Sequence, residues 1–154
     1  MSFKAEEILQ REIVTIVPDT HAIPEILTCR QIIETIRNIC HLLIIPDLRS
    51  EQRFFKQFLF LMTRMEIVLK GKFKLYEKPE KLPPKIEKEL REKGANERDL
   101  TVAGVAWKRR RKDGRKVVIV SNDPAFHSSA QLKSRNVFPI YVSTFIRIML
   151  ENTS

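Results

Sequence analysis

The chain has 154 residues, which fits one ordinary domain, and its hydrophobic content of 43% is enough to cover both faces of a small sheet with helices. Its 28 Lys and Arg residues against 19 Asp and Glu give a formal charge of +9 and a pI of about 9.8, which favours polyanionic partners such as nucleic acid. Charged residues interrupt residues 1–12, and no run elsewhere is long enough to cross a membrane, so a secretion signal and a membrane span are excluded and a cytoplasmic location is expected.

Strands and helices alternate in the first half of the predicted structure. A strand is predicted over residues 12–17, and a helix, or a helix broken around Pro24, over residues 21–40. A second strand follows over residues 42–45, and a long helix starts at residues 46–47. Its apolar residues lie nearly all round the helix, which predicts burial, with a partner surface as the alternative: they are Phe54, Phe55, Phe58, Leu59, Leu61, Met62 and Met65.

The second half continues this alternation after a segment rich in Lys, Glu and Pro. A short edge strand is predicted over residues 72–76, and Pro83-Pro84 starts another helix. The remaining predicted elements are a helix over residues 96–112, a strand over 116–121, a helix to about 133, a strand over 137–142 and a closing helix through 150. Residues 1–154 are therefore predicted to form a single α/β domain with three α/β/α layers around a mainly parallel sheet.

Four acidic residues are predicted to meet at one edge of this sheet. Asp19, Glu51 and Asp123 follow predicted strands. Asp99 lies in the first turn of the predicted helix that leads to the next strand. In open parallel sheets, chemistry gathers beyond the carboxyl ends of the strands, near the point where strand order reverses. The four acids can therefore face the same edge.

Each acid also has a purely structural interpretation. Asp123 stands before a proline, as an N-cap does, and Asn96 and Asp99 have nearly the spacing of a capping box. Asp19 can cap the first helix, and the helix dipole alone favours Glu51. Taken singly, the acids are explained by capping.

Taken together, the acids favour a metal site. Unit charges 4 Å apart repel by about 4 kcal/mol at an effective dielectric near 20, so converging carboxylates need a cation or must take up protons. Oxygen ligands favour Mg²⁺ or Mn²⁺, and the sequence has no Cys and His spacing typical of zinc.

The order Asp, Glu, Asp, Asp on alternating strands and helices resembles the PIN-domain family. The stretches that carry the resemblance are residues 14–20, Val-Thr-Ile-Val-Pro-Asp-Thr, and residues 119–123, Ile-Val-Ser-Asn-Asp. The resemblance implies a PIN-like three-layer fold and a ribonuclease that hydrolyses RNA phosphodiesters with Mg²⁺ or Mn²⁺. It implies these site residues: Asp19, Glu51, Asp99 and Asp123 as catalytic acids, of which Asp19, Asp99 and Asp123 bind the metal, with Ser121 in support. Asp47 is the rival to Glu51 for the second acid.

One departure from the family pattern keeps a second function open. The family commonly has Asp-x-Asn at its first motif, where this chain has Asp19-Thr20-His21. His21 can support the site as a hydrogen-bond donor, or it can mark a catalytically inactive PIN-like module for RNA binding or assembly. The resemblance is compatible with a toxin-type enzyme, and with a homodimer, an antitoxin or another protein as partner.

A dense basic run is the candidate RNA-binding surface. It comprises Lys108, Arg109, Arg110, Arg111, Lys112 and Arg115. Such a run suits phosphate contacts, and the structural alternative is a solvated helix end whose cations complement the dipole.

Overall fold

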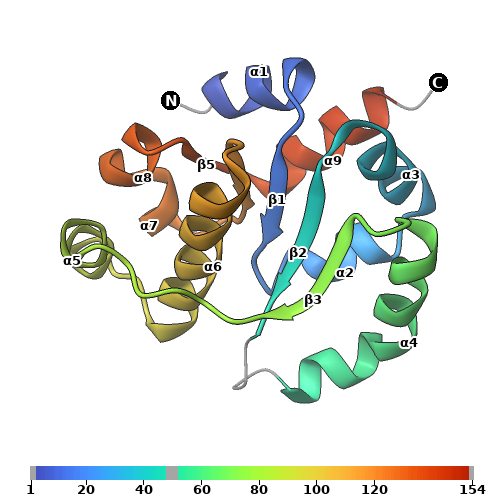
Figure 1. Ribbon diagram of the computed structural model, residues 1–154, viewed down its shortest axis with the longest axis horizontal. Coiled ribbons are helices and arrows are strands. Elements are labelled where there is room, and N and C mark those ends of the chain that lie inside the picture. The colour runs from blue at the N-terminus through green and yellow to red at the C-terminus, as the bar shows by residue number, and fades with distance from the viewer. Residues whose placement is uncertain (1–2, 48–51, 153–154) are drawn as a thin grey trace.

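The central sheet of the computed structural model, which describes residues 3–47 and 52–152, is parallel throughout. Across these residues, its strands follow the order β3-β2-β1-β4-β5, with helices on both faces (Figure 1). The strands are β1 (Thr15–Pro18), β2 (Leu42–Pro46), β3 (Phe73–Glu77), β4 (Val117–Val120) and β5 (Val137–Ile140). The predicted α/β class with three α/β/α layers is confirmed.

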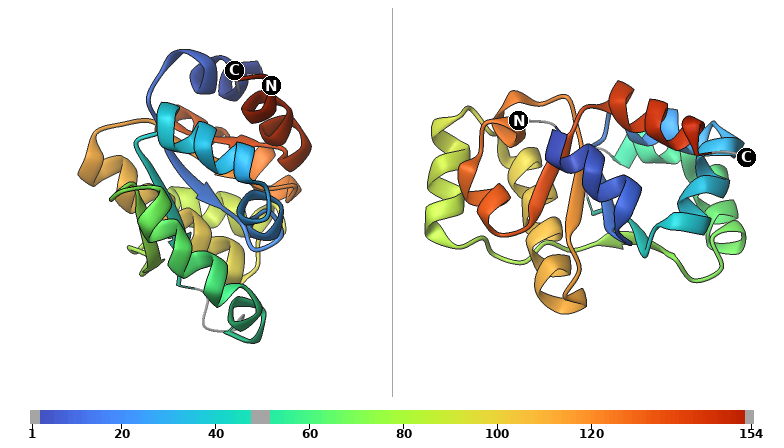
Figure 2. Two further views of the ribbon diagram at one scale, coloured as in Figure 1. Left: turned by 90° about the vertical axis from the view of Figure 1, so that its right-hand side faces the viewer. Right: turned by 90° about the horizontal axis from the view of Figure 1, so that it is seen from above.

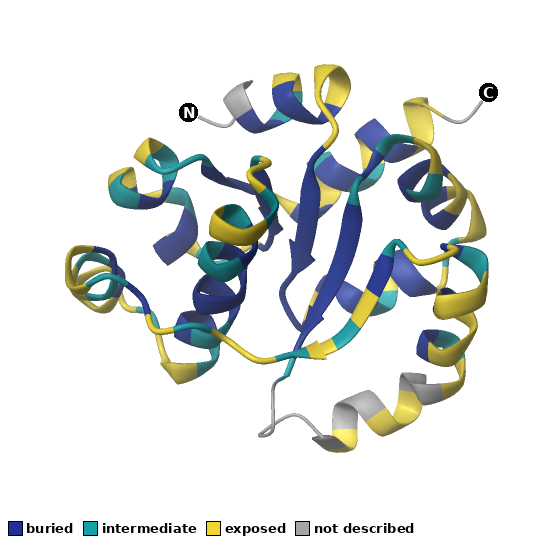
Figure 3. Cartoon of the chain, viewed as in Figure 1, coloured by how far each residue is buried: buried dark blue, intermediate teal, exposed yellow. Residues whose placement is uncertain are grey.

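Burial explains why these residues form strands. Every residue of β1, β2, β4 and β5 is buried, as expected where helices cover both faces of a parallel sheet (Figure 3). At the edge of the sheet, β3 instead alternates between buried Phe73 and exposed Lys74. The predicted edge strand is thus an edge strand, and its alternation shows that one of its faces is covered and the other is open.

The helices divide between the two faces (Figure 2). α6 packs across the middle of one face, against β4, β1 and β2, and α5, α7 and α8 lie on the same face of the sheet. α2, α3, α4 and α9 lie on the opposite face, and α1 lies beside α9. The helices are α1 (Phe3–Arg11), α2 (Ile23–Leu27), α3 (Arg30–Ile39), α4 (Gln52–Val68), α5 (Pro84–Glu92), α6 (Glu97–Asp113), α7 (Pro124–His127), α8 (Ala130–Ser134) and α9 (Val142–Glu151).

Two predicted helices are in fact pairs. The helix predicted over residues 21–40 breaks at Thr28 and Cys29, not at Pro24, because a proline in the first turn of α2 removes no intrahelical hydrogen bond. The helix predicted to end near residue 133 also breaks, where the Ser129 side chain accepts from the backbone N–H of Leu132 and starts α8.

Two further helices can be compared with the prediction. No element was assigned to the segment before β1, where α1 forms and buries Ile8 and Leu9. In α4, Met62 and Met65 are buried as predicted, and Leu61 is half-buried against the core. The side chains at positions 54, 55, 58 and 59 lie outside the described residues.

The segment between β3 and α5 crosses α6 and fixes its position. The backbone N–H of Glu80 donates to the carbonyl of Gly104 at 3.3 Å, and a Cβ at Gly104 would lie 2.7 Å from the carbonyl oxygen of Glu80. The close crossing therefore requires glycine. It holds α6, whose first turn carries Asp99, against the sheet.

Candidate active site

Two strand ends bring the first and last predicted acids together at the carboxyl edge of the sheet. β1 and β4 are in register, with Pro18 opposite Val120, and the backbone N–H of Asp19 donates to the carbonyl of Val120 at 2.9 Å. Asp19 therefore leaves β1 beside the residues that follow β4, which include Ser121 and Asp123. Strand order also reverses here, since β2 lies on one side of β1 and β4 on the other. Ligand sites in open parallel sheets form at such a point.

Ser121 links the two acids through its hydroxyl group. Its Oγ donates to Asp19 Oδ2 at 3.0 Å and accepts from the backbone N–H of Asp123 at 3.0 Å. The other carboxylate oxygen of Asp19 accepts from the backbone N–H of Thr20 at 2.7 Å. Asp19 and Ser121 are both buried, so these hydrogen bonds replace those of water and fix the Asp19 carboxylate in one orientation.

Asp99 reaches the same edge from the first turn of α6. It forms a capping box with Asn96: the Asn96 side chain accepts from the Asp99 N–H at 2.9 Å, and Asp99 Oδ2 accepts from the Asn96 N–H at 3.0 Å. Asp99 is only 1% exposed. Burial raises the pKa of its carboxyl to about 6; the Asn96 hydrogen bond opposes the shift, and the Asp123 and Asp19 carboxylates add to it.

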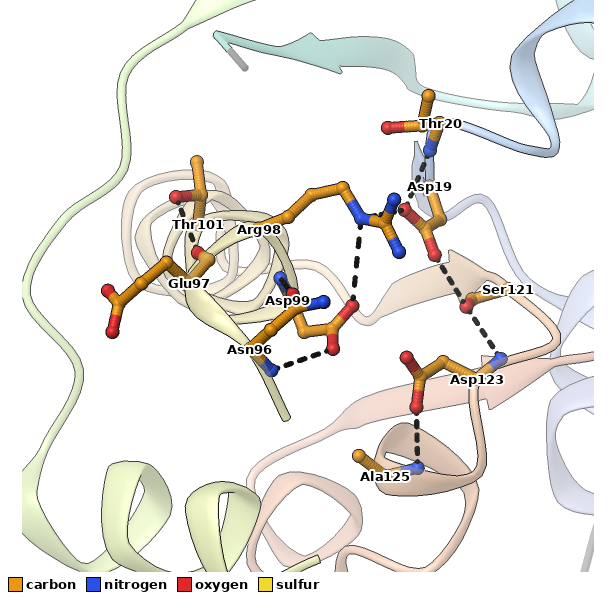
Figure 4. A network of polar contacts seen from close by, with 10 residues as sticks. All are labelled: Asp19, Thr20, Asn96, Glu97, Arg98, Asp99, Thr101, Ser121, Asp123 and Ala125. Carbon is orange, nitrogen blue, oxygen red and sulfur yellow. Dashed lines mark hydrogen bonds and ion pairs between the residues drawn. The ribbon is translucent and has the colours of Figure 1, made fainter. Parts of the chain in front are cut away.

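Asp123 caps a helix and is also part of the candidate site. Its Oδ1 accepts from the backbone N–H of Ala125 at 2.9 Å and so caps α7, while Pro124 stands in the first turn. Its carboxylate lies near enough to Asp99 to raise the pKa of that residue (Figure 4). We refer to Asp19, Asp99 and Asp123 as the acidic cluster.

Arg98 supplies a positive charge inside the acidic cluster. Its Nε lies 3.9 Å from Asp19 Oδ1 and 4.0 Å from Asp99 Oδ1, and its side chain is three-quarters buried (Figure 4). The guanidinium therefore lies between two of the three carboxylates and offsets part of their repulsion. Arg98 was not among the predicted site residues, although it stands directly before Asp99 in the chain.

A cavity of about 240 Å³ opens beside the acidic cluster. Asp19, Asp123, Ser121 and Arg98 line it, with Arg98 on the side of Asp99, and His21 is exposed at the same cavity. The supporting role of His21 stays a prediction. The remaining lining residues are Ala22, Asn122 and Val142.

The donor set of the acidic cluster fits a hard divalent cation. Its ligands are carboxylate oxygens, and Asp99 Oδ1 is buried without accepting a hydrogen bond from the described residues. The spacing is less favourable. Within residues 3–47 and 52–152, no three His, Cys, Asp or Glu side chains are arranged closely enough to hold a metal ion. The Arg98 guanidinium lies between Asp99 and Asp19.

The second predicted acid cannot be placed. Glu51 lies outside the described residues. Its rival Asp47 follows β2, the neighbour of β1, and its backbone N–H donates to the carbonyl of Glu77 at 2.8 Å.

Part of the basic run is buried rather than available to RNA. Arg109 is 6% exposed; its Nε donates to Glu77 Oε1 at 3.1 Å and its Nη1 to Asp113 at 3.3 Å. Lys108 also reaches Glu77, at 3.2 Å. Burial alone would raise the pKa of Glu77, but the hydrogen bonds from these two cations outweigh it and hold that pKa below its usual value. Arg109 is therefore a buried ion-pair residue, and almost none of its side chain is exposed for the predicted contact with RNA.

The rest of the basic run lies nearer the surface. Arg110 is half-buried, Arg111 is exposed and paired with Glu80, and Lys112 and Arg115 are exposed. The sequence pattern did not distinguish these residues from Arg109, because Glu77 is 32 residues from Arg109 in the chain and contacts it only in the folded protein.

No helix within residues 3–47 and 52–152 has the length and apolar character that a membrane span requires. A scan against protein-family models and searches of curated proteins and of solved structures found no match to the chain.

Proposed function

We propose that the protein is a Mg²⁺- or Mn²⁺-dependent ribonuclease that hydrolyses RNA phosphodiesters. The observation that carries the proposal is the convergence of Asp19, Asp99 and Asp123, from three distant parts of the chain, at the carboxyl edge of the sheet, where Asp19 and Asp123 line a cavity. The resemblance of these acids and of Ser121 to the PIN-domain pattern supports the same activity. The formal charge of +9 supports a polyanionic substrate.

In this proposal the acidic cluster holds the divalent ion. When bound, such an ion polarises a phosphoryl oxygen and lowers the pKa of a coordinated water. Ser121 orients the Asp19 carboxylate and the Asp123 backbone through one hydroxyl. Asp19, Asp99 and Asp123 would hold the ion, and His21, which lines the same cavity, would support the site as a hydrogen-bond donor. The second acid of the family pattern would be Glu51 or its rival Asp47.

The state of Asp99 sets the pH range of this site. Its pKa of about 6 means that its carboxyl holds a proton below that pH and is a poorer ligand there. Metal binding and cleavage are therefore expected to rise as the pH increases through 6.

A second candidate is a catalytically silent RNA-binding module. Arg98 favours it, because a guanidinium already balances Asp19 and Asp99, and so does the lack of a close metal-binding group within residues 3–47 and 52–152. In this case the exposed cations Lys112 and Arg115 contact phosphates and no bond is broken.

Cleavage of labelled RNA separates the two candidates. Purified protein is incubated with a labelled single-stranded RNA in Mn²⁺, with EDTA as control. For the ribonuclease, Mn²⁺ supports cleavage, and Asp19→Asn and Asp123→Asn lower its rate by at least about 100-fold. Glu151→Gln is the matched control, since it neutralises an exposed acid on α9.

Isothermal titration and filter binding complete the test. Mn²⁺ binding that is lost in Asp19→Asn supports the enzyme. RNA binding without Mn²⁺ binding or cleavage supports the silent module and overturns the ribonuclease. Cleavage that is unchanged in both Asn variants also overturns it, because the activity then belongs to another site or to a contaminant.

A further inference from the structure

Two aromatic rings stack beside the acidic cluster. The rings of His127, at the end of α7, and Tyr141, which follows β5, have centroids 3.7 Å apart and planes inclined by 6°. This is a parallel stack at close contact distance. Neither ring was assigned a role in the ribonuclease described above. We refer to His127 and Tyr141 as the aromatic stack.

Hydrogen bonds tie the aromatic stack to the candidate active site from both sides. His127 Nε2 donates to the backbone carbonyl of Ser121 at 2.7 Å, and the Ser121 hydroxyl bonds both Asp19 and Asp123. On the other side, the backbone N–H of Val142 donates to Asn122 Oδ1 at 3.0 Å. Ser121, Asn122 and Val142 all line the cavity, so the stack is fixed at its border.

Tyr141 keeps a large exposed surface although His127 covers one face of its ring. Tyr141 is 41% exposed, and its side chain makes no capping hydrogen bond to α9. The stack with His127 occupies one face of the ring, and the opposite face is the one left for a further aromatic partner. His127 is half-buried and holds the ring from behind, which lowers the entropy that Tyr141 loses when it packs against a ligand.

We propose that the aromatic stack is a binding platform for one nucleobase of a single-stranded RNA, stacked on the exposed face of Tyr141. The inference rests on the proposed function for its substrate class. A base is joined through its ribose to the phosphate that the cavity takes, so a flat aromatic surface at the border of the cavity lies on the path of the same strand. Unpaired bases stack readily on tyrosine and histidine rings, and such stacking tolerates any base because every base has a π-face. The platform selects single-stranded over paired RNA.

Binding assays in EDTA test the platform independently of cleavage. A short fluorescein-labelled single-stranded RNA and an abasic oligonucleotide of the same length are titrated with wild-type protein and with Tyr141 variants, and anisotropy is recorded. Tyr141→Phe keeps the aromatic face, Tyr141→Leu keeps bulk without it, and Tyr141→Ala removes both. Thermal melting of each variant checks folding.

The expected result is a loss of affinity for RNA of about 5- to 150-fold in Tyr141→Ala and Tyr141→Leu, with Tyr141→Phe close to wild type. Affinity for the abasic oligonucleotide is expected to be equal in all four proteins. Equal RNA binding by Tyr141→Ala and wild type, or an equal loss for both probes, would overturn the platform, as would a wild type that binds neither probe. If Mn²⁺-dependent cleavage fails while the Tyr141 effect holds, the ribonuclease fails and the platform stands.

Discussion

Replacing Arg98 with alanine tests whether this guanidinium is the internal counter-ion of the acidic cluster. Arg98 Nε lies 3.9 Å from Asp19 and 4.0 Å from Asp99, and both carboxylates are almost fully buried. The substitution leaves Asp19, Asp99 and Asp123 without a balancing charge, which the folded state tolerates only by taking up protons or binding another cation.

The size of the effect follows from these distances. Unit charges about 4 Å apart attract by about 4 kcal/mol at an effective dielectric near 20, and removing one partner of a buried pair costs about 3–5 kcal/mol. Because Arg98 is partly in contact with water, we expect a net loss of roughly 2–3 kcal/mol at pH 7.5. For a chain of this length that lowers the melting temperature by about 5–10 °C.

Differential scanning calorimetry in EDTA and in Mn²⁺ measures the loss and its rescue. Mn²⁺ is expected to raise the melting temperature of Arg98→Ala by more than that of wild type, since the ion no longer competes with the guanidinium. Arg98→Ala combined with Asp99→Asn should recover part of the stability in EDTA, because one uncompensated charge is gone. Arg147→Ala, which removes an exposed cation on α9, is the matched control and should cost under about 1 kcal/mol.

Two results would refute the counter-ion role of Arg98. One is an Arg98→Ala protein as stable as wild type in EDTA, which would mean that water already screens the cluster. The other is a destabilised variant in which Asp99→Asn restores nothing, since the loss would then come from packing of the arginine stem.

Further predictions concern pH, packing and the basic run. Asp99 has a folded pKa of about 6 against 3.8 unfolded, so unfolding free energy should fall as the pH rises from about 4 to 6, and urea titrations of Asp99→Asn should lose that slope and show greater stability at pH 7.5. Gly104→Ala places a Cβ 2.7 Å from the Glu80 carbonyl oxygen and should cost about 1–3 kcal/mol in thermal melting, with wild-type stability contradicting the tight crossing. Arg109→Ala should lower the free energy of unfolding, measured by urea titration, by about 3–5 kcal/mol. Lys112→Ala should keep its stability and reduce the salt dependence of RNA binding measured by filter retention.

The sheet and its acidic edge were predictable because they follow from local patterns and one topological rule. Four β-branched residues in β4 required cover on both faces, and a parallel sheet brings the carboxyl ends of its strands to one edge. The caps were predictable for the same reason. The side chains of Asn96 and Asp123 accept hydrogen bonds from backbone groups two or three residues away, so neither depends on the rest of the fold.

Contacts between distant residues were not predictable in this way. Arg109 stands in a run that reads as a solvated basic surface, and only the approach of Glu77, from the edge strand, turns it into a buried ion pair. The counter-ion role of Arg98 depends in the same way on Asp19, which lies far from it in the chain. The break between α7 and α8 was missed although Ser129 signals it, because the surrounding residues continue a helical pattern.

Capping does not prevent these acids from taking a further role. Each member of the acidic cluster uses one oxygen to hold its own backbone: Asp19 Oδ1 accepts from Thr20, Asp99 Oδ2 from Asn96, and Asp123 Oδ1 from Ala125. The second oxygen is then aimed by a rigid turn, toward Ser121 for Asp19 and toward Arg98 for Asp99. A carboxylate held in this way loses little conformational entropy when it binds a cation. The caps are therefore the means by which the fold holds three acids at one edge of the sheet, and in the proposed ribonuclease a divalent ion would compete with Arg98 for them.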